Sequence, residues 1–499
     1  MQNPTDASLI REKVRQAFSE VLEIPLSEIR DDADFADDLG GNSLHVLSVA
    51  IRLEDALGIT VPDEEYARCR CVNDIVSLLA GGESGQADPA PEKDVQMITR
   101  FEDTPEYKEF MARMDAASQV GNPYFVEHDS ALRDTSVMAG RRVLNFSSYN
   151  YIGMSGDPAT IAAAQAAAAH YGTSASGSRL LGAEKPIHRE LEQAIARWKH
   201  AEDAVVMVSG HATNVTVVGN FCGKGDLILY DALAHNSVHE GCRLSDAESR
   251  AFPHNDANAL RQILKNVRRN YAKVLIVIEG AYSMDGDVAP VPDFVAVKKE
   301  YGCFLMVDEA HSACVLGKTG GGVDEYFGLD PYDIDIKMGT LSKGLGTCGG
   351  YIAGRRNMIE YMRYNIPGFV FSVGLSPVLA AASLEALRQL GSRPEIMVRL
   401  HRNIRLFVEG AKARGFNTCL AGESAIIPIL VGRDEDSYAL SNALAGKDVF
   451  VPPAVYPAVP HGQARLRFCV TSEHTPEEIT YCLDALLDCA AQLGITLPA

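Results

Sequence analysis

The stretch that decides how this chain is organised reads Met338-Gly339-Thr340-Leu341-Ser342-Lys343-Gly344-Leu345-Gly346. It continues residues 333–338, a largely apolar run that we interpret as the end of a β-strand. Gly344 and Gly346 permit tight backbone conformations, so a flat ligand can approach Lys343 closely. Hydroxyl groups in the same stretch suit a phosphate. Taken alone, the pattern is more typical of a surface lysine in a glycine-rich turn.

A second strand end, upstream, changes that interpretation. The apolar run at residues 303–307 ends on Asp308, and His311 follows three residues later. A strand-end acid, a histidine and a lysine on the next strand-loop together suit pyridoxal phosphate. Lys343 would form a Schiff base with the cofactor, and Asp308 would keep the pyridine nitrogen protonated, so that the ring acts as an electron sink.

The composition is that of a globular protein with an ample core, since 46% of the 499 residues are hydrophobic and 22% are charged. This length allows roughly two to four domains. No apolar run reaches the ~18 residues that span a bilayer, and the N-terminus lacks the basic and apolar regions of a signal peptide. The eleven cysteines lack zinc-site spacing, so we expect reduced thiols, no metal and a cytoplasmic location. The net charge of −20 argues against a nucleic-acid partner.

Residues 1–82 are predicted to form a separate acidic module. They hold 16 acidic and 7 basic side chains, a net charge of −9. Apolar side chains recur at helical spacing within residues 7–22, and a second amphipathic helix is predicted to begin near Leu44. Residues 72–79 supply a last short helix. The pattern therefore predicts a small helical bundle.

Ser43 stands at the start of the second predicted helix, after Gly40, Gly41 and Asn42. Serine is favoured as a helix N-cap, and an exposed hydroxyl at a helix start also suits a modifying transferase. The module resembles an acyl or peptidyl carrier protein. This resemblance implies a 4'-phosphopantetheine arm on Ser43, with a phosphopantetheinyl transferase and an acyl-loading enzyme as partners. Asn42 leaves the carrier subtype open.

Residues 83–105 are predicted to be a linker, because residues 81–93 are rich in glycine, proline and small polar side chains. About 20 flexible residues span roughly 25 Å root-mean-square. Such a linker would keep the carrier at about millimolar effective concentration next to the following domain. A charged helix is predicted near residues 105–117.

Residues 106–374 are predicted to form a large α/β domain that begins with a strand and turn at residues 145–153. Helical stretches alternate with short apolar runs at residues 204–208, 227–230 and 274–278. This alternation indicates a mostly parallel, seven-stranded sheet with helices on both faces. Polar motifs follow the runs, as expected for a site at the carboxyl ends of the strands.

Two of these polar motifs suit a cofactor. Ser209, Gly210 and His211 open a helix, where backbone N–H groups favour a phosphate, although simple capping by Ser209 is the alternative. His235 follows a strand end and could lie flat against an aromatic ring, but an isolated histidine is more often structural. The glycine- and serine-rich residues 172–179 are weak evidence for a binding loop.

Residues 375–499 are predicted to form a smaller α+β subdomain. Its strands are predicted at residues 425–431 and 464–470. It closes with a helix that Thr475 starts with a capping box. Strand alternation puts Arg465 and Arg467 on one face, where a guanidinium could clamp a carboxylate, although an exposed strand with two arginines is commoner.

Together, these motifs resemble the α-oxoamine synthases, a family of fold-type I pyridoxal-phosphate enzymes, over about residues 106–499. The segments that are specific in combination are residues 279–287, 307–311, 340–346 and 464–467. By this resemblance Lys343 binds the cofactor and later moves the Cα proton, and Asp308 pairs with the pyridinium nitrogen. His235 stacks on the ring, and His311 hydrogen-bonds its phenolic oxygen.

The same resemblance assigns the remaining site residues. Cofactor-binding residues would be Ser209, Gly210, His211, Ser283 and Thr340, with Thr340 at the phosphate. Arg467 would hold the carboxylate of an amino acid. His211 stands where an aromatic residue is frequent in the family, and this departure bears on the substrates rather than on the ring chemistry.

The resemblance implies a decarboxylative Claisen condensation of an amino acid with an acyl thioester, giving an α-aminoketone and CO2, in a homodimer. From the fused carrier we predict that the acyl group is presented on Ser43. The alternatives are another pyridoxal-phosphate reaction, such as transamination, and a non-catalytic partner subunit. Neither the amino acid nor the acyl group can be named from the residues.

Overall fold

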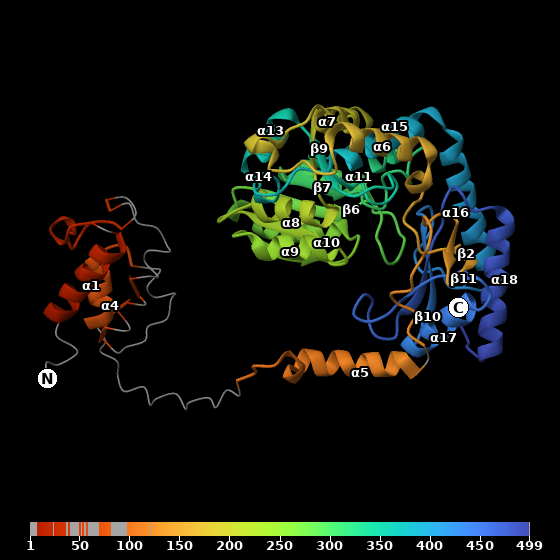
Figure 1. The fold of residues 1–499 in the computed structure, drawn as a ribbon, viewed down its shortest axis with the longest axis horizontal. Helices are drawn as coiled ribbons and strands as arrows, with labels where there is room; N and C mark the ends of the chain where they lie inside the picture. Colours follow the sequence, from red (N-terminus) through yellow and green to blue (C-terminus); the bar gives the residue numbers. More distant parts are fainter. Residues whose placement is uncertain are drawn as a thin grey trace. The chain divides into compact units, whose positions relative to one another are not determined.

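The computed structural model describes residues 7–22, 24–35, 38–39, 49–50, 52–53, 56–57, 69–80, 97–119 and 121–498. The chain divides into two compact units, Met1–Asp103 and Thr104–Ala499 (Figure 1). Among the helices so described, none is long and apolar enough to cross a membrane. The proposed linker at residues 83–105 and the proposed boundary at residue 375 stay predictions.

The first unit contains the first and last helices predicted for the acidic module. These are α1 (Ala7–Leu22) and α4 (Val72–Ala80), with short 3₁₀ turns at Leu26–Glu28 and Phe101–Asp103. Their apolar faces close on a small buried core, in which the rings of Phe18 and Phe35 stack 4.0 Å apart. Ser43 and most of the second predicted helix lie outside the described residues.

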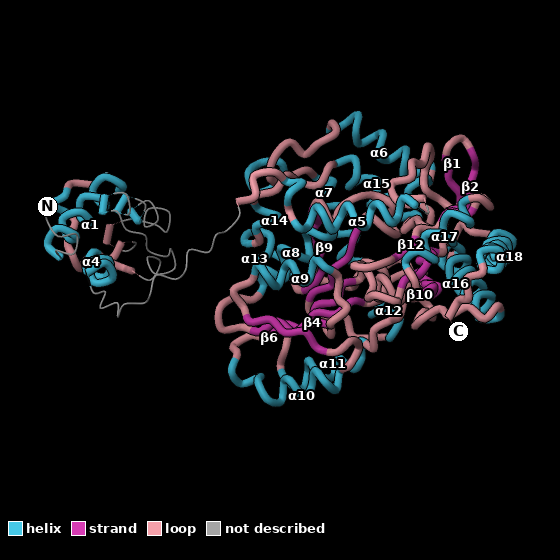
Figure 2. Tube along the Cα trace, turned by 90° about the horizontal axis from the view of Figure 1, so that it is seen from below, coloured by secondary structure: helices cyan, strands magenta, loops and turns pink. Residues whose placement is uncertain are grey.

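The second unit is built on the predicted seven-stranded sheet, whose strands are drawn in magenta in Figure 2. Their order in the sheet is β3-β9-β8-β7-β6-β4-β5. The strands are β3 (Asp203–Met207), β4 (Leu227–Asp231), β5 (Glu248–Phe252), β6 (Val274–Glu279), β7 (Phe304–Asp308), β8 (Ile336–Thr340) and β9 (Gly350–Gly354). The five neighbouring strands β5, β4, β6, β7 and β8 run parallel to one another. Strand β9 is antiparallel to both of its neighbours, β3 and β8. The predicted α/β class is confirmed.

Helices cover both faces of this sheet, which is why the strands read as continuous apolar runs. One core joins the strands to α7, α10, α11 and α15, and the other joins them to α8, α9 and α13. The helices of the domain are α6 (Pro158–Tyr171), α7 (Pro186–Trp198), α8 (Gly210–Phe221), α9 (Asn236–Leu244), α10 (Ala257–Val267), α11 (Val291–Tyr301), α12 (Val323–Phe327), α13 (Arg356–Asn365) and α14 (Pro367–Val370), with short turns at Met154–Gly156, Arg179–Ala183 and Arg268–Asn270.

Two small sheets and five further helices complete the described part of the second unit. Strands β10 (Ile426–Gly432), β13 (Ala464–Cys469) and β12 (Pro453–Ala454) pair antiparallel, and β1 (Thr135–Met138), β2 (Arg141–Asn145) and β11 (Val449–Phe450) form the second sheet. The helices there are α5 (Pro105–Gln119), α15 (Pro377–Ser392), α16 (Glu395–Ala413), α17 (Asp434–Ala445) and α18 (Pro476–Leu493). The predicted capping box of Thr475 is confirmed.

One strand prediction at the entry of the domain was wrong. The strand lies at β2 and ends at Asn145, so residues 146–153 form a loop, with a turn at residues 151–152, that leads into the 3₁₀ turn at Met154–Gly156. Asn145 ends the strand because its side-chain oxygen accepts hydrogen bonds from the backbone N–H of Ser147 (3.0 Å) and from its hydroxyl (2.7 Å). Strand β2 pairs in parallel with β11, so this early segment joins a sheet made with the C-terminal part.

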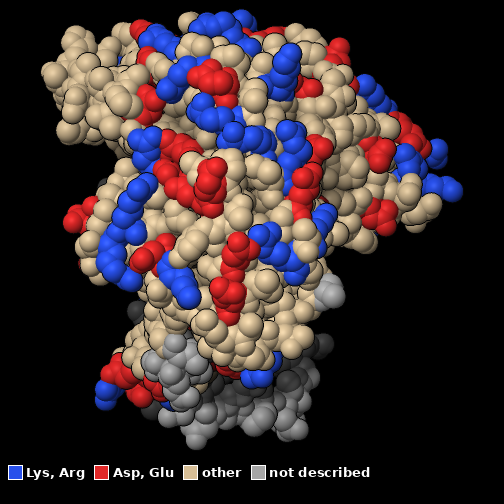
Figure 3. All heavy atoms as spheres, turned by 90° about the vertical axis from the view of Figure 1, so that its right-hand side faces the viewer, with Lys and Arg blue, Asp and Glu red and all other residues tan. Residues whose placement is uncertain are grey.

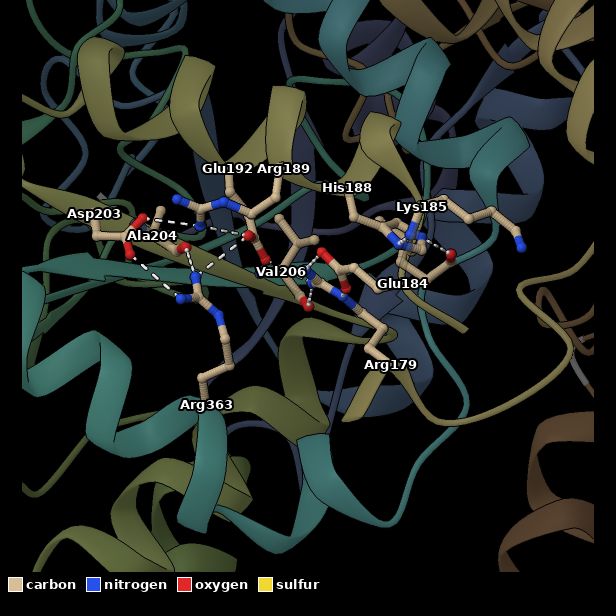
Figure 4. A network of polar contacts seen from close by, with 11 residues as sticks. Arg179, Glu184, Lys185, His188, Arg189, Glu192, Asp203, Ala204, Val206 and Arg363 are labelled. Carbon is tan, nitrogen blue, oxygen red and sulfur yellow. Dashed lines mark hydrogen bonds and ion pairs between the residues drawn. The ribbon is translucent and has the colours of Figure 1, made fainter. Parts of the chain in front are cut away.

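A buried ionic network anchors the sheet edge at β3 (Figure 4). The carboxylate of Glu192 on α7 accepts hydrogen bonds from Arg179 (2.5 Å), Arg189 (2.9 Å) and Arg363 (3.3 Å). It also accepts one from the backbone N–H of Val206 in β3 (3.1 Å). On the outer face drawn in Figure 3, in contrast, basic and acidic side chains are interspersed, so that face shows no large patch of one sign.

Candidate active site

The predicted polar residues converge at the carboxyl edge of the large sheet. Glu279, Asp308 and Thr340 are the last residues of the neighbouring strands β6, β7 and β8. In the strand register Glu279 lies beside Asp308, and Asp308 lies beside Met338. Because parallel strands end at one edge, three side chains that are distant in sequence come together in space.

Lys343 belongs to the loop that follows β8, and glycines shape this loop. A Cβ on Gly344 would lie 2.4 Å from Cβ of Cys314. Gly346 has a φ of 67°, and a Cβ there would lie 2.3 Å from the backbone nitrogen of Ser155. Both positions therefore require glycine, which fixes the path of the loop around Lys343.

The ammonium group of Lys343 is linked to two further side chains. Its Nζ lies 2.6 Å from Nε2 of His311, and Nδ1 of His311 lies 2.7 Å from the hydroxyl of Tyr151. Burial lowers the pKa of His311 well below its usual value, while burial raises that of Tyr151. A neutral imidazole donates from one nitrogen and accepts at the other. The three groups therefore form a continuous path along which a proton can pass to or from Lys343.

Burial also lowers the pKa of Lys343, to about 8. The positive charge of Arg467 acts in the same direction, and the negative charges of Asp308 and Glu279 oppose it in part. These influences place Asp308, Arg467 and Lys343 in one electrostatic environment. A lysine with a pKa near neutrality has a substantial neutral fraction, which is the form able to act as a nucleophile or a base.

The pKa of Lys343 predicts how the rate of covalent cofactor attachment depends on pH. Below pH 8 Lys343 is mostly charged and unreactive, so the rate of covalent attachment of pyridoxal phosphate should rise about tenfold per pH unit and level off above pH 8. An ordinary lysine would place this midpoint near 10. Stopped-flow absorbance between pH 6.5 and 9.5 measures the profile. A midpoint near 10 would contradict the expected environment of Lys343.

Asp308 is buried and is positioned by Asn214. Its carboxylate accepts hydrogen bonds from Nδ2 of Asn214 (2.6 Å) and from the backbone N–H of Ala310 (2.9 Å). Asn214 also donates to Ser237 (2.9 Å), whose hydroxyl lies 2.7 Å from Nδ1 of His235. The predicted acid and the predicted ring-stacking histidine are thus connected by two residues that sequence reasoning did not identify.

Glu279 is a second site residue that sequence reasoning missed. It is 2% exposed, and its Oε1 has no hydrogen-bond partner among the described residues. Burial and the neighbouring negative charge of Asp308 raise the pKa of Glu279 well above its usual value. The paired ends of β6 and β7 therefore hold two carboxyl groups next to each other at the site.

The predicted phosphate cradle lies at the start of α8. Ser209 caps this helix by accepting a hydrogen bond from the N–H of Ala212 (3.4 Å). A Cβ on Gly210 would lie 2.8 Å from the hydroxyl oxygen of Thr340, so only glycine lets the helix approach this strand end. The Thr340 hydroxyl lies 2.6 Å from that of Ser342.

These groups fit pyridoxal phosphate. A helix N-terminus beside two hydroxyls suits a phosphate, and the buried carboxylate of Asp308 suits a pyridinium nitrogen. His211 is exposed next to this cradle, and its ring meets that of His235 edge-on at 6.1 Å. His235 is likewise exposed, so its ring face is available to a ligand.

The two arginines of β13 are both buried, at 3% and 7% exposure, so the alternative of an exposed strand with two arginines does not hold. Arg465 is already neutralised by Asp285 (2.6 Å). Arg467 donates from Nε to the carbonyl of Ser283 (2.5 Å), and its guanidinium carbon lies 4.9 Å from the centre of the Tyr149 ring. Arg467 forms no ion pair within the described part of the chain. It is therefore the arginine that is available to an incoming carboxylate.

A cleft of about 620 Å³ leads to this arginine. Arg467 and Tyr149 lie at one part of its wall, and the remaining wall is mostly apolar. It includes Phe110 and Met114 of α5 and the proline-rich loop at residues 452–458. An apolar chain can therefore lie in the cleft with its polar end near Arg467.

Comparisons with known proteins agree with this arrangement. The family model for aminotransferase class I and II matches residues 141–486, and the model for a phosphopantetheine attachment site matches residues 12–79. An 8-amino-7-oxononanoate synthase from Symbiobacterium thermophilum is 39% identical over 369 residues, which cover 74% of this chain and 94% of that protein. 8-Amino-7-oxononanoate synthase 1 from Bacillus subtilis is 37% identical, with coverages of 71% and 90%.

Solved structures of serine palmitoyltransferases also resemble this chain. The serine palmitoyltransferase of Sphingomonas wittichii superposes with a TM-score of 0.75 at 32% identity, over 79% of this chain and 99% of that one. A serine palmitoyltransferase from S. paucimobilis, with PLP and myriocin bound, superposes with a TM-score of 0.75 at 31% identity, over 78% and 99%. These matches cover 90–99% of the length of the relatives.

Proposed function

Since this chain belongs to the α-oxoamine synthase family and also carries a phosphopantetheine attachment domain, we propose that it condenses an amino acid with an acyl thioester held on its own Ser43. The products are an α-aminoketone, CO2 and the free thiol of the phosphopantetheine arm. The observation that carries the proposal is the convergence of Lys343, Asp308 and Arg467, which makes no ion pair with a described residue, in a polypeptide that also contains the carrier.

When bound, pyridoxal phosphate supplies an electron sink for negative charge at the amino acid's Cα. Lys343 would hold the cofactor covalently and move the Cα proton, with His311 hydrogen-bonding the ring oxygen. Asp308 would hold the pyridine nitrogen protonated, and His235 would pack against the ring. The remaining contacts to the cofactor would come from Ser209, Gly210, His211, Ser283 and Thr340.

Arg467 would bind the carboxylate of the amino acid. A guanidinium binds a carboxylate through two parallel hydrogen bonds, which fixes its orientation as well as its position. Because Arg467 is buried and makes no ion pair in the described part of the chain, this interaction is little screened by water. The fixed carboxylate would orient the amino acid so that its Cα faces Lys343 and, after the condensation, the carboxylate leaves as CO2.

The carrier would deliver the acyl group without release of a free intermediate. A linker of roughly 20 residues gives a tethered group an effective concentration in the millimolar range. We further propose that the protein is cytoplasmic and works as a homodimer, and that a phosphopantetheinyl transferase and an acyl-loading enzyme are its other partners. The largely apolar cleft beside Arg467 suits the acyl chain that the carrier would present.

The test is to replace Ser43 by alanine. After treatment of the apo-carrier with a phosphopantetheinyl transferase and acyl-CoA, the parent protein should release CO2 and an acyl-derived aminoketone when given its amino acid. The Ser43→Ala protein should be at least about 100-fold slower with micromolar acyl donor, because it loses the millimolar tethered concentration. Mass spectrometry of protein and product, with each amino acid in turn, measures acyl loss and amino-acid choice together.

A matched control is Ser77→Ala, which removes an exposed hydroxyl from α4 of the same unit and should leave the rate unchanged. If Ser43→Ala condensed acyl groups as fast as the parent protein, delivery by the carrier would be disproved. Retention of CO2 with a requirement for an amino acceptor would instead identify transamination.

A further inference from the structure

His254 lies between two carboxylates that belong to different strand ends. Its Nδ1 is 2.9 Å from Oδ1 of Asp231, the last residue of β4, and its Nε2 is 3.0 Å from Oδ2 of Asp287, in the loop after β6. A carboxylate only accepts hydrogen bonds, so both ring nitrogens must donate, and the ring is an imidazolium. Burial alone would lower the pKa of His254, but the bonds to Asp231 and Asp287 raise it to about 10.

Asn255 strengthens the same link. Its backbone N–H donates to Oδ2 of Asp231 (2.8 Å), and its side-chain amide donates to Oδ2 of Asp287 (2.6 Å). The ring of Tyr282 meets that of His254 edge-on at 4.4 Å. The segment after β5 therefore ties together the ends of β4 and the loop at residues 280–288, and the side chain of His254 is only 19% exposed.

The loop at residues 280–288 has two further close contacts besides those of His254 and Asn255. The backbone N–H of Tyr282 donates to the carbonyl of Asp287 (2.9 Å), which closes the loop on itself. Gly286 has a φ of 71°, and a Cβ there would lie 2.1 Å from the carbonyl oxygen of Ile426 in β10. The loop is thus pressed against the C-terminal subdomain at one side and held by His254 at the other.

This loop holds both arginines of β13. The carbonyl of Ser283 accepts the Nε hydrogen of Arg467 (2.5 Å), and the carboxylate of Asp285 pairs with Arg465 (2.6 Å). A shift of the loop would therefore change where the guanidinium of Arg467 points. Such a shift would not move Lys343, which lies on the separate loop after β8.

We propose that His254 is a positioning residue, which locks the loop at residues 280–288 so that Arg467 is aimed at the carboxylate of the amino acid. The inference rests on the proposed role of Arg467. If the inference is right, recognition of the carboxylate depends on the side chain of His254, whereas attachment of an amine at the cofactor does not. Asp287 links His254 to the loop, and Asp231 at the end of β4 holds the imidazole ring in place.

The test compares amino acids with the same amines lacking the carboxylate. The probes are glycine with methylamine, alanine with ethylamine and serine with ethanolamine, and the change in cofactor absorbance of the loaded full-length protein gives each Kd. In His254→Gln the Kd of the amino acid that the parent binds best should rise at least about tenfold, with the Kd of its amine within about twofold of the parent value. Asp287→Asn should behave in the same way.

The control variant is His170→Gln, which changes an exposed histidine at the end of α6 and should alter neither Kd. Equal weakening of amine and amino acid in both His254→Gln and Asp287→Asn would overturn the inference, and so would unchanged binding of the amino acid. Arg467→Ala distinguishes a failure of the proposed role of Arg467 from a failure of the inference about His254. If it leaves the binding of the amino acid unchanged, the proposed role of Arg467 fails; if it weakens that binding and His254→Gln does not, only the inference about His254 fails.

Discussion

The variant Lys343→Ala should bind pyridoxal phosphate without a covalent bond and condense its substrates about 10²- to 10⁴-fold more slowly than the parent protein. The amine of Lys343 is the proposed base of the site; it is buried, has a pKa near 8 and lies 2.6 Å from His311. Removing it leaves the phosphate cradle, Asp308 and Arg467 in place. Binding of the cofactor should therefore persist while proton movement at Cα is lost.

Two measurements check this expectation. Borohydride reduction of the loaded protein, followed by intact mass analysis, should leave the cofactor mass on the parent protein and none on Lys343→Ala. A small primary amine such as ethylamine should restore part of the lost rate, because it replaces the missing base. Lys318→Ala, which changes an exposed lysine, is the control and should retain both properties. Covalent cofactor on Lys343→Ala would show that another lysine holds it.

Much of the fold was predictable because burial on both faces makes the inner strands continuous apolar runs. Strands β4, β6 and β7 were predicted to within a residue or two for this reason. Strand β9 was missed because its sequence, Gly-Tyr-Ile-Ala-Gly, begins and ends with glycine. Strand β5 was missed because it lies at the sheet edge and its first four residues are exposed. Neither pattern differs from that of a loop.

The site was predictable only where one residue type has a distinctive chemical role. Asp308 directly follows an apolar run, His311 and Lys343 lie within five residues of the end of such a run, and the structure brings the three side chains together. Asn214 could not be identified, and Glu279 was overlooked, because their contacts with Asp308 run across strands rather than within a local pattern. The signal for Glu279 was present, since a carboxylate at the end of a fully buried strand is rarely left without a function.

Strand alternation could not separate Arg465 from Arg467 either. Both side chains point to the same face of β13, and both are buried. Only the three-dimensional position of Asp285, far away in sequence, shows that Arg465 is paired and that Arg467 remains available. The pairing of β2 with β11 was equally hidden, because a two-residue strand carries no periodicity.

A cluster of four buried charges lies directly behind the site and should control the stability of the large domain. Lys199 pairs with Glu309 (2.5 Å) and with Asp324 (3.3 Å), and Lys337 of β8 pairs with Asp324 (2.6 Å). All four side chains are at most 8% exposed. The cluster is neutral as a whole, with two positive and two negative groups, and Glu309 is the residue that follows Asp308.

Replacing Asp324 with alanine should lower the free energy of unfolding by about 3–5 kcal/mol, because it leaves two buried ammonium groups with a single carboxylate between them. Urea denaturation of the full chain, followed by circular dichroism, measures the loss. The double variant Asp324→Leu/Lys337→Met removes one charge of each sign and should recover most of the stability, since an apolar pair avoids the cost of burying ions.

The control is Asp488→Ala, at an exposed position of α18, which should change the free energy of unfolding by less than about 0.5 kcal/mol. If the double variant were as unstable as Asp324→Ala, loss of packing rather than an unpaired charge would be the cause.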